Sequence, residues 1–245
     1  MPSQDSRAFA GGGHTANLLL AALPENVLEA LTEQASIISL SRGRVLQELG
    51  EPVREALFPH GSVIALVSPM SDQKVVETAT VGAEGYLGFW AVLGDDQRAL
   101  CRAVVHSSGT ATRVSIDGLL RLSRTHPILN DLLLRFSKVL LKQSIQSAAC
   151  SSVHTLEARC ARCLLEAHDR TGSGASIMLS RTLLAAMLGV RRQSLAAVIR
   201  SFEAHGIVRL DSSSVIVLDR ARLEALSCRC YGVLRETYQT ILPLP

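Results

Sequence analysis

The sequence lacks the features of a membrane-embedded or exported protein. No uninterrupted apolar run reaches the roughly 18 residues that a bilayer-spanning helix needs, because Lys, Arg or Glu interrupts the long apolar stretches. The N-terminal segment 1–26 has no basic cluster followed by an apolar core, which a signal peptide would require. We therefore expect a cytoplasmic protein with no membrane partner, whose six cysteines are reduced thiols and not a disulfide framework.

Signatures of catalysis and of metal binding are also missing. The seven histidines show no metal-binding periodicity, and no glycine-rich phosphate loop follows a predicted strand. Cys160 and Cys163 have the spacing of a redox or zinc pair but lie inside a predicted helix, and Cys228–Cys230 is distant and one residue too tight. We therefore predict no enzyme, no metal site and no cofactor. The cysteines are interpreted as buried helical residues, with a thiol-based redox sensor as the alternative.

Aromatic residues are scarce, at 4%, whereas hydrophobic residues make up 47% of the 245-residue chain. The length suits two compact domains with aliphatic cores. The net charge of +3 says little about partners, but the charges are unevenly distributed: residues 150–245 hold 12 Lys+Arg, all arginine, against 8 Asp+Glu, while residues 1–149 hold 13 against 14. Because arginine forms forked contacts with phosphates and guanine edges, the C-terminal part is the better candidate for nucleic-acid binding.

Short β runs fill much of the first half of the chain, after an N-terminal arm at 1–14 and a helical segment at 15–35. Turn signals separate the runs, and many short strands at this spacing are typical of an antiparallel sandwich or roll. We assign this domain to residues 15–125. The expected strands are Ile37–Leu40, Val45–Gln47, Ala56–Pro59, Val63–Val67, Val75–Ala79, Cys101–Val105 and Ala111–Ile116.

A long helix is predicted over 126–151, with Pro127 in its first turn. Its apolar stripe recurs at three- and four-residue spacing and consists of Leu129, Leu132, Leu133, Phe136, Val139 and Leu140. Two interpretations stay open. The stripe either packs on the chain's own β domain or pairs with its twin in a homodimer, and both can be partly true.

The last region, 152–227, contains a helix-turn-helix pattern, followed by a tail at 228–245. Ser180 is a good N-cap for a helix at Arg181–Leu188, and Gly189 can adopt the left-handed conformation of a sharp turn. A second helix is predicted at Arg192–Ala204, with Gly206 as its C-cap. The small Ala185 sits where the two helices would approach, and apolar residues occupy the inward positions of both.

The outer face of the second helix carries the chemistry. Its start is polar and basic, with Arg191, Arg192, Gln193 and Ser194, and Arg200 follows on the outer side. A recognition helix enters the major groove by its N-terminal end, where Arg suits guanine and Gln suits adenine. A hairpin at Ile207–Leu210 and Val215–Leu218 lies where a wing would be, and Asp219 caps a closing helix.

This order of elements resembles the Crp/Fnr family of transcription regulators. The segments that carry the resemblance are LSRTLLAAMLGVRRQSLAAVIRSFEAHGIVRL at 179–210, HTLEARCARCLLEAHDRTG at 154–172 and VVETATVGAEGYLG at 75–88. The implied fold is α+β: an antiparallel β-roll like a cyclic-nucleotide-binding domain, a long dimerisation helix and a C-terminal winged helix-turn-helix. The implied function is a homodimer that binds a near-palindromic site on double-stranded DNA. RNA polymerase is left open as a further partner.

By position, Arg192 and Gln193 match the base-reading residues of the family. Arg181 can reach a base or a phosphate, whereas Ser180, Arg191 and Ser194 fit phosphate contacts. Ala197 replaces an arginine that reads a base in some members, and the turn of the hairpin, Asp211-Ser212-Ser213-Ser214, carries no positive charge. The resemblance therefore implies an operator that differs from that of the cyclic-AMP-dependent members.

The resemblance implies an effector pocket in the β-roll, but this sequence departs from the family pattern there. Members that bind cyclic AMP carry a glycine–glutamate pair followed by an arginine–serine or arginine–threonine pair. Here the glycine is followed by Phe89, and Arg98 and Arg102 are the basic residues near Gly88 that could meet an anion. Cyclic AMP is therefore not expected, and the effector is unknown. Other members of the family bind an iron–sulfur cluster through cysteines near the N-terminus. This sequence has no cysteine before Cys101, so that kind of sensor is not expected. An alternative function is a signalling module of this fold that acts through protein contacts.

Overall fold

The computed structural model describes residues 13–69, 75–94, 96–171, 177, 181–211 and 214–242. They belong to two compact units, one within Met1–Val67, Thr80–Val139 and Ile241–Pro245, the other within Ser68–Ala79 and Leu140–Thr240. The predicted N-terminal arm lies outside the described residues except for Gly13 and His14. Among the described residues no single helix is long and apolar enough to cross a membrane, and only the bent pair Arg181–Leu188 and Arg192–Ala204 passes that test of length and composition.

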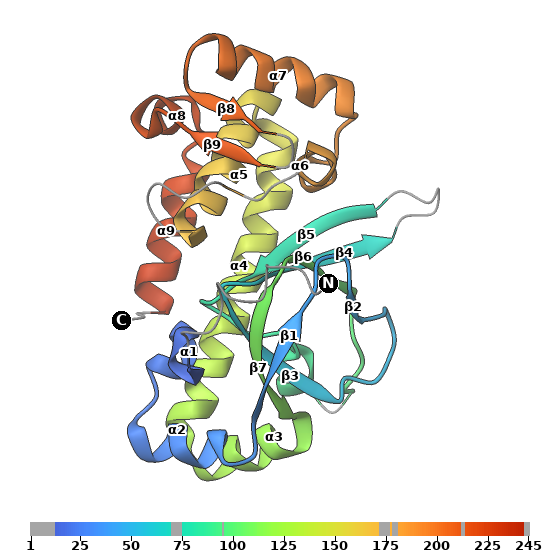
Figure 1. Cartoon of the computed structure of the whole chain (residues 1–245), viewed down its shortest axis with the longest axis vertical. Coiled ribbons are helices and arrows are strands. Elements are labelled where there is room, and N and C mark those ends of the chain that lie inside the picture. Colours follow the sequence, from blue (N-terminus) through green and yellow to red (C-terminus); the bar gives the residue numbers. More distant parts are fainter. Residues whose placement is uncertain are drawn as a thin grey trace, which may run out of the picture. The chain divides into compact units, whose positions relative to one another are not determined.

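Two antiparallel sheets form a β-roll (Figure 1), and most of its residues belong to the first unit. One has the strand order β1-β7-β3 and the other β2-β6-β4-β5. The seven predicted strands and the antiparallel fold are thereby confirmed, with ends that differ by a few residues. The strands are β1 (Ser36–Leu40), β2 (Val45–Gln47), β3 (Glu55–His60), β4 (Val63–Pro69), β5 (Val75–Val81), β6 (Arg102–Ser107) and β7 (Gly109–Ser115).

The few aromatic residues are concentrated in the core of the β-roll. The rings of Phe58, Phe89 and Phe136 surround Tyr86, with ring centroids 5.3, 6.5 and 5.4 Å from that of Tyr86. A Cβ atom at Gly85 would overlap the Phe136 ring, so only glycine fits beneath it. Burial raises the pKa of the Tyr86 hydroxyl far above its usual range. The aromatic cluster thus fixes the start of the long helix to the β-roll.

Short helices flank the β-roll. Asn17 is fully buried, caps α1 (Leu18–Ala21) through the backbone N–H groups of Leu19 and Leu20, and donates to the carbonyl oxygens of Pro59 and Gly85. The helices α2 (Glu25–Thr32), α3 (Ile116–Thr125) and the 3-10 turns η2 (His14–Ala16) and η3 (Phe89–Val92) complete the unit. The sequence analysis did not predict α3, which is capped by the hydroxyl of Ser115.

The long helix α4 (Pro127–Val153) contains the predicted range 126–151 almost entirely. Five of the six residues of the predicted apolar stripe are buried within the chain: the exposed fractions of Leu129, Leu133, Phe136, Val139 and Leu140 are 3% or less, whereas Leu132 is partly exposed. This supports the interpretation that the stripe packs on the chain's own β-roll. A pairing surface for a second copy therefore has to lie on another face of α4.

The second unit is helical with one hairpin. Its elements are α5 (Leu156–Thr171), α6 (Arg181–Leu188), α7 (Arg192–Ala204), β8 (Val208–Leu210), β9 (Val215–Val217), α8 (Arg220–Leu226) and α9 (Cys230–Ile241). They enclose a core cluster in which Leu164, Leu195 and Leu223 are fully buried. Asp219 caps α8 by accepting from the N–H of Arg222, as predicted.

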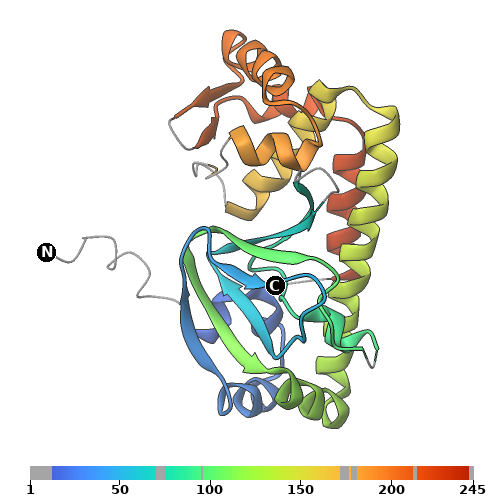
Figure 2. The same cartoon turned by 90° about the vertical axis from the view of Figure 1, so that its right-hand side faces the viewer.

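The prediction of a tail at 228–245 missed α9. In both views α9 runs beside the C-terminal half of α4 (Figures 1 and 2). Tyr231 on α9 donates to Asp169 on α5, at 2.8 Å, and accepts from Arg220 on α8, at 2.6 Å. Burial, together with the hydrogen bond to Asp169, raises the pKa of Tyr231. Because these bonds connect three helices, α9 is an integral part of the second unit.

Candidate DNA-binding interface

The two helices of the predicted helix-turn-helix begin and end where the sequence places them. Helix α6 covers Arg181–Leu188 and α7 covers Arg192–Ala204, and the angle between them is 111°. Helix-turn-helix motifs have angles of about 90–120°. The predicted N-cap Ser180 lies outside the described residues. The geometry of the pair is therefore that of a helix-turn-helix and not of an antiparallel hairpin.

Gly189 forms the turn because it adopts a left-handed conformation, with φ at +64°. The N–H of Gly189 donates to the carbonyl of Ala186 and that of Val190 to the carbonyl of Ala185. These are the two bonds of a Schellman motif, which satisfies the last carbonyl groups of α6. Gly206 ends α7 in the same way, with φ at +67° and bonds from the N–H groups at 206 and 207 to the carbonyls at 203 and 202.

The inner faces of α6 and α7 pack against each other and against α5. Ala185 is 3% exposed and faces this core together with Leu184 and Leu188, while Leu195, Ile199 and Phe202 come from α7. Arg159 on α5 donates through Nη2 to the carbonyl oxygen of Leu188 at 2.6 Å. Sequence reasoning missed this contact, which secures the last turn of α6 from the neighbouring helix.

The first turn of α7 presents a polar and basic surface. Arg192, Gln193 and Ser194 are exposed, as are Arg191 just before the helix and Arg200 on its outer side. Within the described part of the chain, no hydrogen bond or ion pair holds the guanidinium groups of Arg191, Arg192 or Arg200, so they are available to a partner. The positive end of the helix dipole adds to their charge. This end of α7 is therefore suited to a polyanion.

Two further arginines enlarge this candidate surface. Arg181 is exposed in the first turn of α6, as predicted. Arg209 is exposed on β8, which pairs with β9 in the predicted wing through the register Arg209↔Ile216. Sequence reasoning considered only the turn of this hairpin, whose residues Ser212 and Ser213 lie outside the described residues. The alternation of exposed and buried positions along β8 would have identified Arg209.

An alanine at Gly189 tests the turn, and an alanine at Gly232 is its control, because neither substitution meets a neighbouring atom. We expect Gly189→Ala to lower the free energy of unfolding by roughly 1–2 kcal/mol, the cost of a left-handed alanine. Nothing lies within 4 Å of the added Cβ, so backbone strain alone produces this loss. The matched variant Gly232→Ala, inside α9 and also without neighbours within 4 Å, should gain about 0.5–1 kcal/mol. Urea unfolding measures the free energy of unfolding of both variants. A change of the same sign and size in the two variants would contradict the left-handed turn at Gly189.

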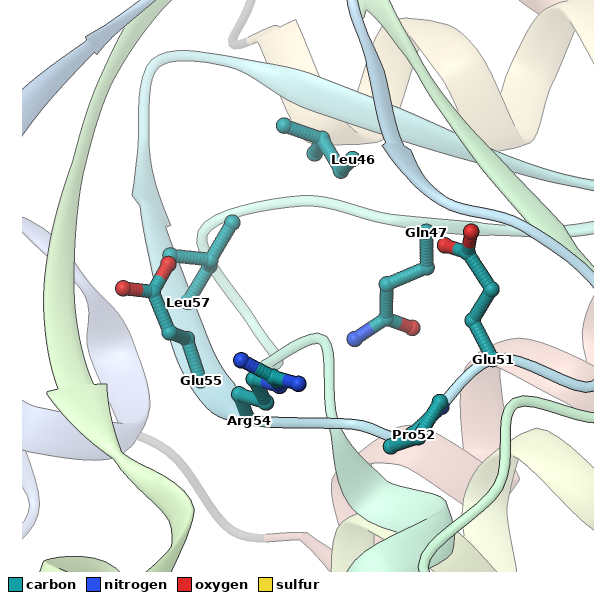
Figure 3. Close-up of a pocket in the computed structure, with 7 residues that line it drawn as sticks. All are labelled: Leu46, Gln47, Glu51, Pro52, Arg54, Glu55 and Leu57. Carbon is teal, nitrogen blue, oxygen red and sulfur yellow. The ribbon is translucent and has the colours of Figure 1, made fainter.

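A cavity of about 400 Å³ opens in the β-roll of the first unit. Figure 3 shows the residues around it: Leu46, Gln47, Glu51, Pro52, Arg54, Glu55 and Leu57. Arg54 supplies the positive charge of this lining, and Glu51 and Glu55 the negative charge. The lining is thus mixed in charge and does not resemble a site made for a phosphate alone.

The residues predicted for an effector do not line this cavity. Arg98 donates to the carbonyl oxygen of Gly50 at 2.8 Å, and Arg102 pairs with Glu48 at 3.1 Å. Gly88 has φ at +103° and precedes η3, whose first residue, Phe89, is buried in the aromatic cluster. The role of Gly88, Arg98 and Arg102 in effector binding stays a prediction.

The structure separates the cysteines into different environments. Cys160 and Cys163 are buried in α5, within the core that also holds the inner faces of α6 and α7. Burial raises the pKa of the Cys160 thiol far above its usual range, whereas a reactive thiol needs a lowered pKa. Burial likewise raises the pKa of Cys101 in the β-roll, to about 11. The interpretation of Cys160 and Cys163 as structural helical residues agrees with these environments.

Comparison with protein families supports the interpretation of α6 and α7 in the second unit as a helix-turn-helix. Residues 158–226 match the family described as the Crp-like helix-turn-helix domain. The match begins in α5 and ends with α8, so it contains the helix-turn-helix and the hairpin. A search of curated proteins found no match.

Solved structures share the fold over most of the chain. FixK2 from Bradyrhizobium japonicum is 16% identical, and the match covers 79% of this chain and 98% of that one, with a TM-score of 0.69. The c-di-GMP-responsive global regulator CLP from Xanthomonas campestris is 15% identical over 79% of this chain and 99% of that one, with a TM-score of 0.64. A CRP/FNR-family transcriptional regulator from Thermus thermophilus is 18% identical over 78% and 98%, with a TM-score of 0.61. The chain therefore contains a segment that matches the Crp-like helix-turn-helix domain, and it shares its fold with these solved structures.

Proposed function

We propose that the protein is a homodimeric transcription regulator that reads double-stranded DNA with the N-terminal end of α7. The observation that carries this proposal is the exposure of Arg192, Gln193 and Ser194 in the first turn of the second helix of a helix-turn-helix. In this docking mode the N-terminal residues of the second helix contact base edges, while the first helix crosses the backbone.

The side chains divide into two roles in this proposal. Arg192 has the forked donors that guanine accepts in the major groove, and the amide of Gln193 matches adenine. Arg191, Arg200 and Ser194 would contact phosphates, as would Ser180 if it caps α6, and Arg181 would contact a base or a phosphate. Phosphate contacts fix the register of the protein on the duplex, whereas base contacts provide sequence specificity.

The exposed face of α4 supports the proposed dimer. Leu134, Leu141 and Ile145 are 40%, 62% and 57% exposed although they are large and apolar. They belong to a row of exposed positions at alternating spacings of four and three residues: Leu134, Lys138, Leu141, Ile145, Ala148 and Ser152. This is the a/d spacing of a coiled coil. A second copy of α4 would cover the row and would place two recognition helices on neighbouring half-sites.

We also propose that the β-roll does not respond to cyclic AMP. The position after Gly88, where members that bind cyclic AMP have a glutamate, holds Phe89, which is 6% exposed and packs against Tyr86 and Phe136. A phenyl ring in an aromatic core offers no oxygen to a ribose hydroxyl. The effector stays unidentified, and contact with RNA polymerase and the cytoplasmic location stay predictions.

The salt dependence of binding tests whether DNA is the partner. Each phosphate contact releases counterions, so the logarithm of the binding constant should fall with the logarithm of salt concentration with a slope of about −0.9 per contact. Titration of a fluorescent mixed-sequence duplex at several salt concentrations measures this slope. Arg191→Ala should make the slope shallower, by about one contact per protomer, whereas the exposed Arg121→Ala on α3 should leave it unchanged. A flat salt response of the unmodified protein would contradict DNA binding.

A further inference from the structure

A cluster of three thiols and one imidazole lies within the second unit, away from α6 and α7. Cys150 is in the last turn of α4, and His154 follows it by four residues. Cys230 is the first residue of α9, and Cys228 precedes it by two positions. One Sγ atom from each cysteine and one ring nitrogen of His154 all lie within 4.8 Å of one another. The fold thus brings the side chains of His154 and Cys228 close together, although the two residues are 74 positions apart along the chain.

Local backbone structure explains this convergence. The N–H of His154 donates to the carbonyl of Cys150 at 3.1 Å, so the helical spacing continues past the end of α4 and places both side chains on one face. Helix α9 then runs antiparallel to α4. The hydroxyl of Tyr238 donates a hydrogen bond to Gln143, and Gln146, further along α4, donates to Cys230 at the start of α9. This pairing brings the Cys-Arg-Cys segment at 228–230 against the end of α4.

The distances within the cluster suit a tetrahedral metal ion. The Sγ atoms of Cys150 and Cys228 are 3.5 Å apart, and Sγ of Cys230 is 3.6 Å from Nδ1 of His154. With zinc–sulfur and zinc–nitrogen bonds of about 2.3 and 2.0–2.1 Å, a tetrahedron has edges of about 3.8 Å between sulfurs and about 3.6 Å between sulfur and nitrogen. A disulfide would require about 2.05 Å between sulfurs, and all three cysteines are free thiols.

The surroundings also fit a metal site better than an apolar core. Among the described residues, the buried apolar members of this cluster are Cys150, Cys228 and Cys230, and Ala158 is the one partly buried apolar residue packed against them. The amide Nε2 of Gln146 donates to Sγ of Cys230 at 3.0 Å, as outer-sphere groups do for zinc-bound thiolates. Arg162 is 5% exposed and interacts electrostatically with Cys150, and its Nε has no hydrogen-bond acceptor among the described residues.

From this geometry we infer that Cys150, His154, Cys228 and Cys230 bind one Zn²⁺ ion per protomer. Binding releases three thiol protons to solvent, so that three thiolates and a neutral imidazole surround the ion. The complex then carries a net charge of about −1 and lies near the Arg162 guanidinium, which also pairs with Glu166 at 2.7 Å. Four protein ligands leave no open coordination position, so the site is structural and not catalytic. This inference revises the expectation of no metal site and does not depend on DNA binding.

The ion would fasten the end of α4 to the segment between α8 and α9. That segment follows directly on the Crp-like domain, which ends at residue 226. Zinc at this point therefore joins the proposed dimerisation helix to the end of the DNA-binding domain by coordinate bonds. Removing it is expected to destabilise the second unit, because structural zinc contributes directly to folding free energy.

Metal analysis of the full-length protein tests the site. The protein is reconstituted with ZnCl₂ under a thiol reductant, passed through a desalting column and analysed by plasma mass spectrometry, with about one zinc per protomer expected. Substitution by Co²⁺ should give the strong visible bands of a tetrahedral ion and thiolate-to-cobalt charge transfer in the near ultraviolet. A reconstituted protein without bound zinc, or a cobalt spectrum of an octahedral aquo ion, would overturn the inference.

Variants assign the ligands. Cys150→Ser and Cys228→Ser should each reduce bound zinc to a small fraction of the unmodified level and weaken the cobalt charge-transfer band, with circular dichroism as the check of folding. Cys101→Ala, which removes an equally buried thiol in the β-roll, should retain the full zinc content. Loss of zinc in Cys101→Ala, or full retention in both serine variants, would assign the metal to other groups. If the serine variants do not fold, the cobalt spectrum of the unmodified protein still decides between the outcomes.

Discussion

Replacing Arg192 and Gln193 together by alanine is expected to reduce DNA binding to the level of non-specific DNA. Each forked contact with a base contributes about 1–3 kcal/mol of discrimination, and a dimer carries two copies of each contact. The summed loss of roughly 4–12 kcal/mol per dimer is comparable to the margin of about 4–10 kcal/mol that separates specific from non-specific binding. Both side chains are exposed, so the fold should be unaffected. Titration of a selected operator and of an unrelated duplex measures the two affinities.

Single variants refine this expectation. Arg192→Ala alone should weaken specific binding by roughly 1–3 kcal/mol per half-site and relax the preference at one base pair in each. The exposed Arg121→Ala on α3 is the matched control, since it removes the same charge from the β-roll unit. If the double variant kept the full preference for the operator, the assignment of base reading to the start of α7 would be wrong.

Replacing Leu141 and Ile145 together by glutamate is expected to convert the proposed dimer into monomers. In a two-fold symmetric parallel pair of helices, residues of the a and d rows meet their own counterparts. Each substitution would therefore bring two negative charges together in an apolar seam. Because the side chains are 62% and 57% exposed, the change does not disturb the core of the protomer, and glutamate is a good helix former. Sedimentation velocity measures the mass, which we expect to halve.

The DNA readout separates a dimerisation defect from a general effect of added charge. A monomer can occupy only one half-site, so binding to the complete operator should fall to that of an isolated half-site. The control is the pair Leu49→Glu and Leu100→Glu in the β-roll, whose side chains are 53% and 68% exposed. These substitutions add the same charge outside α4 and should leave a dimer. A dimer that survives the α4 substitutions would refute the proposed seam.

The helix-turn-helix was predictable because its determinants are local. A glycine is needed where the backbone adopts a left-handed conformation, and Gly189 and Gly206 occupy the two such positions. The apolar spacing within α6 and α7 then defines their inward faces without reference to distant residues. For the same reason the strands of the β-roll could be located from alternation and turns, although their order within two sheets follows from pairing that the sequence pattern does not disclose.

The features that sequence reasoning missed depend on distant contacts. The spacing of the stripe that contains Leu133 and Phe136 suits packing on a β-roll or on a second helix. The contacts of the Phe136 ring with Tyr86 and Phe89 show that this part of the stripe packs on the β-roll. The Cys-Arg-Cys segment lacks a second cysteine pair nearby in sequence. Its partners are Cys150 and His154, which the antiparallel packing of α9 on α4 supplies. A search for Cys and His at helical i, i+4 spacing would have identified this second half of the cluster.

Selection of bound DNA from a random duplex pool tests the central claim most directly. The claim is that two copies of α7 read two half-sites through Arg192 and Gln193. The account predicts a two-fold symmetric consensus whose half-sites lie about one helical turn apart, and a change at one base pair in each half-site for Arg192→Ala. An enriched pool without symmetry, or one that the variant leaves unchanged, would contradict it.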